Sequence, residues 1–222
     1  MAIDGDIHLL PYGRSRQATG GDASSRLLIF ALAERTMSHS FSRMQRINIV
    51  GNTGSGKTTL ARRLGRRLNC PNVDLDDIHW GPDWRMPAVP EFRTRVRQAT
   101  AGERWVIAGN YSKVRDIVLS RADTVVWLDF PLPVSLWRLW WRTLRRLLTR
   151  EELFAGNRES WRVQFLTRNS LFLWALQSYR RRRRELWTVK EHPAYAHLTW
   201  WRFTQPTDLE RWLDDLDRDR QA

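Results

Sequence analysis

The chain has 222 residues, and its 37 Lys and Arg residues against 24 Asp and Glu residues give a formal net charge of +13 at pH 7. A balance this basic attracts polyanions, which can be nucleotides, nucleic acid or an anionic membrane surface, and composition does not choose among them. The single cysteine, Cys70, excludes an intrachain disulfide and favours a reducing cytoplasm. No apolar run reaches the roughly 18 residues of a membrane span, and no secretory signal pattern stands out, so we expect no transmembrane segment.

Residues 1–43 differ in composition from the rest of the chain. They mix Gly, Ser, Thr, Asp and Arg with one short apolar patch at residues 27–33, and a recognisable strand begins only at Arg46. We therefore expect residues 1–43 to be a poorly ordered N-terminal extension, whose role the sequence leaves open. Residues 44–222 are long enough to form one domain with a sizeable core.

Within this domain, strand-like and helix-like segments alternate, which predicts an α/β fold with a mainly parallel five-stranded sheet between helices. We expect the strands at residues 46–50, 73–75, 105–108, 124–128 and 198–203. A first helix is predicted over residues 56–68. A last helix is predicted to begin at Thr207, because Thr207 and Glu210 have the spacing of a capping box and an apolar stripe follows.

The segment that follows the first strand fits the P-loop pattern G-x-x-x-x-G-K-[ST] between a strand and a helix. Its glycines let backbone N–H groups surround phosphates, and the start of the helix adds partial positive charge. Lys57 can reach the β- and γ-phosphates, and the hydroxyl of Thr58 can bind Mg²⁺. The sequence therefore predicts an ATP site formed by Gly51, Asn52, Thr53, Gly54, Ser55, Gly56, Lys57, Thr58 and Thr59.

Polar residues follow the next strands, where ligands of parallel sheets bind. We expect Asp74 to help hold Mg²⁺ and Asp76 to act in catalysis, since carboxylates facing a polyanion need a cation or a hydroxyl donor. A charged turn is the alternative for this acidic cluster. The predicted acceptor site comprises Asp76, Asp77, His79, Trp84, Asn110 and Tyr111, although packing is the alternative for His79 and Trp84.

An arginine-rich helical lid is predicted over about residues 136–190. Arg138, Arg142 and Arg145 share one stripe of a helix, and guanidinium groups suit phosphoryl oxygens. A solvated helix face is the alternative. We expect an apolar stripe on the same helix to pack against the protein; it contains Trp137, Trp140, Trp141, Leu144 and Leu148. Three further arginines would complete the lid: Arg158, Arg162 and Arg168.

The run Arg180 to Arg184 wraps around a helix, so its five side chains cannot all reach one nucleotide. We expect most of them to be solvated, with weak nucleic acid binding as the second interpretation. No specific DNA-binding motif accompanies the run.

These motifs resemble the small P-loop kinases, which include adenylate, shikimate and gluconate kinases, over roughly residues 44–216. The segment Asp74-x-Asp76-x-x-His79 has the spacing of a gluconate kinase segment that meets the acceptor and the metal. Leu128-Asp129-Phe130-Pro131 followed by Arg138 and Arg142 matches the entry to the adenylate kinase lid. The segment Gln205-Pro206 resembles the loop that contacts adenine in those enzymes.

The overall pattern is most similar to adenylate kinase-related proteins labelled DNA topology modulation (FlaR-like) proteins. Trp105 to Tyr111 follows their W-V-I-D-G-N-Y segment except that alanine stands at position 108. In adenylate kinases the aspartate at this position helps to hold hydrated Mg²⁺. The resemblance therefore implies that Thr58 must be helped by Asp74, Asp76 or Asp129.

The sequence thus predicts a cytoplasmic, Mg²⁺- and ATP-dependent kinase of the nucleotide kinase type, with Lys57, Arg138, Arg142 and Asp76 in catalysis. It names neither the small-molecule acceptor nor the oligomeric state. Two alternatives remain open: an ATP-dependent regulator associated with nucleic acid, motivated by the charge, and a nucleotide-binding protein with weak catalysis, motivated by Ala108.

Overall fold

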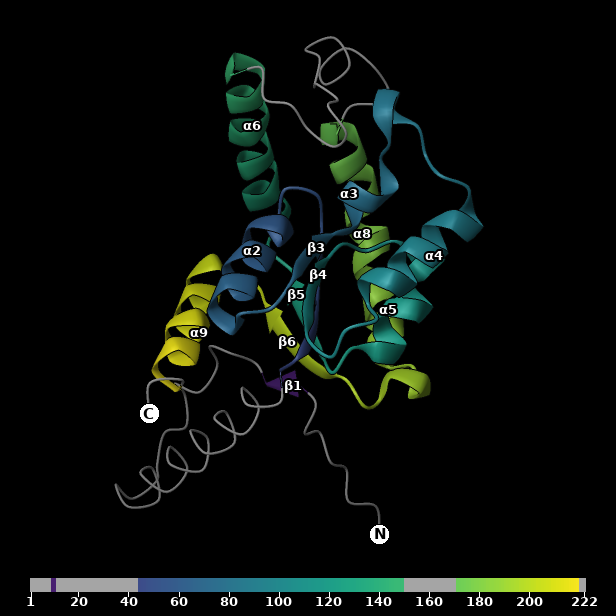
Figure 1. Cartoon of the computed structure of the whole chain (residues 1–222). Helices are drawn as coiled ribbons and strands as arrows, with labels where there is room; N and C mark the ends of the chain where they lie inside the picture. Colours follow the sequence, from purple (N-terminus) through teal and green to yellow (C-terminus); the bar gives the residue numbers. More distant parts are fainter. Residues whose placement is uncertain (1–8, 11–43, 150–170, 220–222) are drawn as a thin grey trace, which may run out of the picture.

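The computed structural model describes residues 9–10, 44–149 and 171–219 (Figure 1). A six-stranded parallel sheet has the strand order β1-β6-β5-β2-β4-β3. The five predicted strands are confirmed, and the two-residue strand β1 adds to the edge beyond β6. The strands are β1 (Leu9–Leu10), β2 (Arg46–Gly51), β3 (Asn72–Asp74), β4 (Trp105–Ala108), β5 (Thr124–Leu128) and β6 (Thr199–Phe203).

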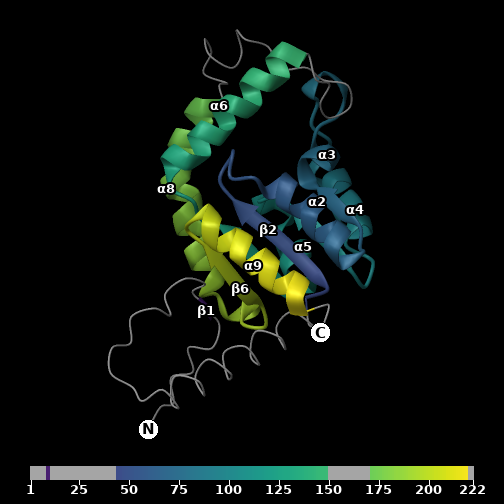
Figure 2. The ribbon, with the colours of Figure 1, turned by 90° about the vertical axis from the view of Figure 1, so that its left-hand side faces the viewer.

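Helices cover both faces of this sheet, which gives the predicted three-layer α/β/α fold (Figures 1 and 2). The central strand β2 lies between β5 and β4, so the chain order reverses beside it and opens a crevice at the carboxyl ends of the strands. The helices are α2 (Lys57–Leu68), α3 (Leu75–His79), α4 (Val89–Ala99), α5 (Arg115–Arg121), α6 (Leu132–Thr149), α8 (Leu171–Lys190) and α9 (Pro206–Asp219).

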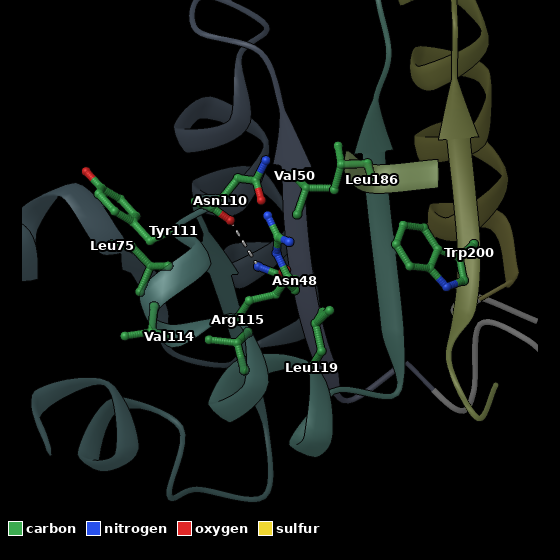
Figure 3. A pocket seen from close by; sticks show the side chains of 12 residues that line it. Asn48, Val50, Leu75, Asn110, Tyr111, Val114, Arg115, Leu119, Leu186 and Trp200 are labelled. Atoms are coloured by element: carbon green, nitrogen blue, oxygen red, sulfur yellow. Dashed lines mark hydrogen bonds between the residues drawn. The ribbon is translucent and has the colours of Figure 1, made fainter. Parts of the chain in front are cut away.

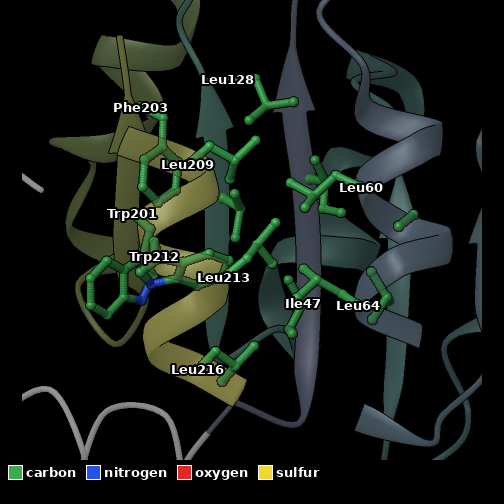
Figure 4. Close-up of a cluster of buried hydrophobic side chains, with 14 of the residues drawn as sticks. Ile47, Leu60, Leu64, Leu128, Trp201, Phe203, Leu209, Trp212, Leu213 and Leu216 are labelled. Carbon is green, nitrogen blue, oxygen red and sulfur yellow. The ribbon is translucent and has the colours of Figure 1, made fainter. Parts of the chain in front are cut away.

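Two apolar cores result, one on each face of the sheet. On the first, Ile47 of β2 and Trp201 of β6 meet the apolar stripes of α2 and α9 (Figure 4). On the second, Val50 and Trp127 pack against α4, α5 and the C-terminal half of α8. The alternation of side chains along each strand explains this division, because successive residues point to opposite faces. All strand residues of β4 and β5 are buried, as expected for a sheet covered on both sides.

The predicted capping box of the last helix is wrong. Helix α9 begins at Pro206, with proline in the first turn, so Thr207 lies inside the helix. The carboxylate of Glu210 instead accepts hydrogen bonds from Nη1 and Nη2 of Arg63 at 2.7 and 2.6 Å. A bidentate pair between α2 and α9 has replaced the local cap.

The expected packing of the apolar stripe on α6 is also wrong. Trp137, Trp141 and Leu148 are 63, 51 and 73% exposed, whereas Ser135, Leu139 and Thr143 are buried on the opposite side of the helix. Gly54 has no side chain, and this allows Ser135 and Leu139 of α6 to approach the P-loop closely. The tryptophans are left on the outside.

Of the N-terminal extension, only the two residues of β1 are described. The centre of the predicted lid, with Arg158, Arg162 and Arg168, lies outside the described residues. Among the helices that are described, none has the length and apolar character required to cross a bilayer.

Candidate active site

The P-loop joins the end of β2 to the start of α2 and rests against the first turn of α6. Gly54 has a φ of 79°, which favours glycine, and a Cβ on it would collide with the carbonyl oxygen of Ser135. Arg138 of α6 donates from Nη1 to the carbonyl oxygen of Ser55 at 3.1 Å and lies over the ring of Phe130. The arginine predicted for the lid therefore contacts the phosphate-binding loop directly.

Lys57 is folded back along the loop, and its Nζ donates to the carbonyl oxygen of Asn52 at 2.9 Å. The pKa of Lys57 is lowered from 10.5 to about 8, mainly by burial. The carboxylates of Asp76 and Asp74 oppose this shift, whereas the positive charges of Arg182 and Arg142 add to it. Two arginines and two carboxylates thus lie near enough to Lys57 to influence its charge. This cluster has the composition of a phosphoryl-transfer site.

A chain of hydrogen bonds connects the P-loop to the acidic segment. Thr58 donates from Oγ1 to Oδ2 of Asp74 at 2.6 Å, and Oδ1 of Asp74 accepts from the backbone N–H of Asp76 at 3.0 Å. The hydroxyl of Tyr111 donates to Oδ1 of Asp76. Burial and the neighbouring Asp76 raise the pKa of Asp74, while burial and the same carboxylate raise the pKa of Tyr111 far above its usual range. Four of the predicted site residues therefore form one connected group.

The donors of this group fit a hydrated Mg²⁺. Thr58 and Asp74 bring a hydroxyl and a carboxylate oxygen together, and Mg²⁺ commonly takes one or two carboxylates, substrate phosphates and waters. Ala108 is fully buried at the end of β4 and offers no oxygen-bearing side chain. The described residues contain no group of three or more His, Cys, Asp or Glu side chains arranged to hold a metal by themselves.

Asp129 is engaged elsewhere. Its Oδ2 accepts from Nε of Arg202 at 2.8 Å and from Nε of Arg183 at 3.1 Å. The guanidinium of Arg202 also lies over the rings of Trp127 and Trp187, at 5.2 and 5.0 Å from their centroids. Of the three carboxylates considered as partners of Thr58, this arrangement favours Asp74 and Asp76.

The other residues predicted for the acceptor site are only partly brought together. His79 is buried, with its ring centroid 4.5 Å from that of Tyr111 and 4.9 Å from that of Phe92. This position favours packing behind Asp76, and burial lowers the pKa of His79. Asp77 is exposed, and Trp84 is 40% exposed and touches Trp80 edge to face.

Asn110 and Tyr111 point in opposite directions. Asn110 faces a small pocket between β2, α5 and α8, together with Asn48 and Arg115, whereas the ring of Tyr111 turns away from it (Figure 3). Asn48 donates from Nδ2 to the carbonyl oxygens of Ile107 and Gly109, which fixes the backbone just before Asn110. Only Tyr111 of this pair reaches the acidic segment.

The structure adds Arg182 of α8 to the site. A pocket beside the P-loop is lined by Gly51, Asn52, Asp129, Phe130 and Arg182, among others. Burial lowers the pKa of Arg182, and its charge interacts with Tyr111 and Asp76. Arg180, Arg181 and Arg184 are exposed, in agreement with the expected solvation of most of the run.

A helical signal for Arg182 is present in the sequence. The positions four and seven residues to either side of Arg182 are all buried. They are Ala175, Ser178, Leu186 and Val189. This stripe places Arg182 on the inner side of α8. The adjacent arginines obscure the pattern.

The chain is similar in sequence to several known proteins and in structure to several kinases. No protein family profile matches it. It is 26% identical over 140 residues to Threonine synthase-like 1 of Macaca fascicularis, covering 54% of this chain and 19% of that protein. A crystal structure of shikimate kinase from Bacteroides thetaiotaomicron is similar over 81% of this chain and 99% of its own, with a TM-score of 0.48 and 19% identity.

The uncharacterized protein YqaC of Bacillus subtilis (strain 168) is 30% identical over 128 residues, which cover 57% of this chain and 71% of YqaC. The chain belongs to the family of YqaC.

Proposed function

We propose that this protein is an ATP-dependent phosphotransferase, similar to nucleotide kinases, that transfers the γ-phosphoryl group of ATP to a small-molecule acceptor. The observation that carries the proposal is that hydrogen bonds connect Thr58 of the P-loop to Asp74 and Asp76, while Arg182 lines the pocket beside Gly51 and Asn52. The charges of Arg142 and Arg182 also act on Lys57. Cations are needed around the equatorial oxygens of the transferred group, and a carboxylate is needed near the attacking hydroxyl.

In this proposal the P-loop amides hold the β- and γ-phosphates, and Lys57 turns from Asn52 to the phosphate oxygens. Where the acceptor group is a hydroxyl, Asp76, which Tyr111 orients, accepts the hydroxyl proton. The oxygen of the acceptor then bonds to the γ-phosphorus. The bond between the γ-phosphorus and the β–γ bridging oxygen breaks, and ADP leaves. Arg142 and Arg182 balance the charge on the transferred group.

Thr58 and Asp74 would hold Mg²⁺ beside the phosphates. The bound ion would neutralise charge on the β- and γ-oxygens. The hydrogen bond from Thr58 to Asp74 would leave the lone pairs of the Thr58 hydroxyl oxygen available to the ion.

The test is transfer of radiolabelled γ-phosphate from ATP to nucleoside monophosphates, shikimate-like compounds and sugar acids, each with and without Mg²⁺. We expect Mg²⁺-dependent transfer to at least one class, lost by about 10²-fold or more in Lys57→Ala. Exposed Lys113→Ala is the matched control and should retain activity. A wild-type protein that binds ATP through Lys57 but phosphorylates none of these compounds would disprove the assignment.

The affinity for ATP is expected to fall by about tenfold between pH 7 and pH 9, because the pKa of Lys57 in the free protein is about 8. Only the protonated form pairs with phosphate, and its fraction falls from about nine-tenths to one-tenth over this range. Calorimetry in two buffers of different ionisation enthalpy should show proton uptake on binding near pH 8. Lys57→Arg keeps its charge, so a decline of equal size in that variant would exclude Lys57 as the cause.

A further inference from the structure

The outer side of α6 carries an unusual concentration of exposed tryptophan. Trp137, Trp140 and Trp141 are 63, 41 and 51% exposed, and Leu148 farther along the helix is 73% exposed. Their spacing places them on the side opposite the buried Ser135, Leu139 and Thr143. We call Trp137, Trp140, Trp141, Arg145 and Leu148 the tryptophan face. Adjacent exposed apolar side chains of this kind mark an interaction surface.

The charge of α6 restricts what can bind there. Its 18 residues include no aspartate or glutamate, but they include Arg138, Arg142, Arg145 and Arg146. Exposed Arg145 borders the tryptophans directly. Indole rings prefer the boundary between hydrocarbon and headgroups, and arginine extends its charge to anionic headgroups. The face therefore complements an anionic lipid surface in both polarity and charge.

Because of the position of α6, a flat surface such as a bilayer can reach the tryptophan face. The helix extends beyond the carboxyl ends of the strands and lies at the outer edge of the molecule in both views (Figures 1 and 2). Arg138 contacts the P-loop from another side of the helix, so the tryptophan face is not part of the nucleotide site.

Two other partners fit less well. In a twofold contact with a second copy, α6 would meet its own arginine-rich sequence, and like charges repel. Single-stranded nucleic acid stacks on open aromatic faces, but Trp137 and Trp141 pack edge to face, with an interplanar angle of 80° and centroids 5.5 Å apart. They do not form parallel platforms for successive bases.

We propose that the tryptophan face of α6 binds the surface of an anionic lipid bilayer. This inference is independent of the proposed phosphotransfer. The indole rings enter the headgroup region, and Arg145 pairs with lipid phosphate. The carboxyl ends of the strands, and the P-loop with them, then lie near the bilayer.

The test is cosedimentation of the full chain with phosphatidylcholine vesicles that contain or lack phosphatidylglycerol. We expect salt-sensitive binding to the anionic vesicles and a blue shift of tryptophan fluorescence. The double substitution Trp137→Gln/Trp141→Gln should weaken binding by about tenfold or more, and Arg145→Gln by about fivefold. Met86→Gln removes a side chain of similar exposure, 62%, from another element and should leave vesicle binding unchanged.

Binding of a fluorescent ATP analogue confirms that each variant is folded. Equal binding to neutral and anionic vesicles, or equal binding by the double variant and Met86→Gln, would overturn the proposal. Absence of vesicle binding would also overturn it. In that case, single-stranded oligonucleotide binding lost in the double variant would assign the face to nucleic acid, and dimer dissociation in that variant would assign it to a second copy.

Discussion

Replacing Arg182 with alanine is expected to lower kcat/KM for phosphoryl transfer by about 10²- to 10³-fold, the effect of removing one donor that acts on developing charge. The expectation follows from the location of Arg182 beside Gly51 and Asn52, where its charge is close enough to lower the pKa of Lys57. A guanidinium placed there can contact two phosphoryl oxygens at once. Steady-state kinetics with a saturating acceptor will measure the loss.

The matched control for Arg182→Ala is Arg184→Ala. Arg184 belongs to the same arginine run but is exposed two positions farther along α8, so its replacement should change kcat/KM by less than about twofold. If Arg182 acts mainly during transfer, kcat falls more than the affinity for ATP, and Arg182→Lys restores part of the rate. Equal activities of Arg182→Ala and Arg184→Ala would remove Arg182 from the mechanism.

The sheet and the P-loop could be predicted from the sequence because their signals are local. Apolar residues from Ile47 to Val50, followed by Gly51, specify both the strand and the turn that follows it. The connection from Thr58 to Asp74 and then Asp76 was also accessible, since consecutive parallel strands deliver their ends to one edge. Their chemical roles remain predictions.

The orientation of α6 could not be predicted from its periodicity. Periodicity shows that the tryptophans share a stripe, but it does not show which stripe faces the protein. Gly54 lies so close to α6 that a Cβ on it would collide with the backbone carbonyl of Ser135. The choice between the two sides is therefore made by a tertiary contact, and the larger apolar side chains remain outside.

Glu210 illustrates the same limitation for charge. Its spacing from Thr207 indicates a local cap, whereas Arg63 on another helix offers two donors in bidentate geometry. The bidentate pair with Arg63 connects α2 to α9 on one face of the sheet. The local capping pattern therefore failed as a predictor, because the position of Arg63 relative to Glu210 depends on the tertiary fold.

Replacing Asp129 with alanine is expected to lower the free energy of unfolding by about 3 kcal/mol, which is the scale for breaking one side of a buried ion pair. The Asp129 side chain is only 3% exposed, and that of Arg202 is 20% exposed. Without the carboxylate, Arg202 stays between Trp127 and Trp187 with its charge unpaired, and Arg183 loses its attachment to the sheet. Urea denaturation followed by far-UV circular dichroism will measure the change.

Asp116→Ala provides the control for this measurement. Asp116 also accepts two hydrogen bonds from one arginine, Arg93, but its side chain is 58% exposed, so the loss should stay below about 1 kcal/mol. Combining Asp129→Ala with Arg202→Met removes both charges and should recover part of the lost stability, because no guanidinium is then left buried alone. If Asp129→Ala costs no more than Asp116→Ala, the ion pairs of Asp129 do not stabilise the attachment of α8 beside the P-loop, and another contact must position Arg182.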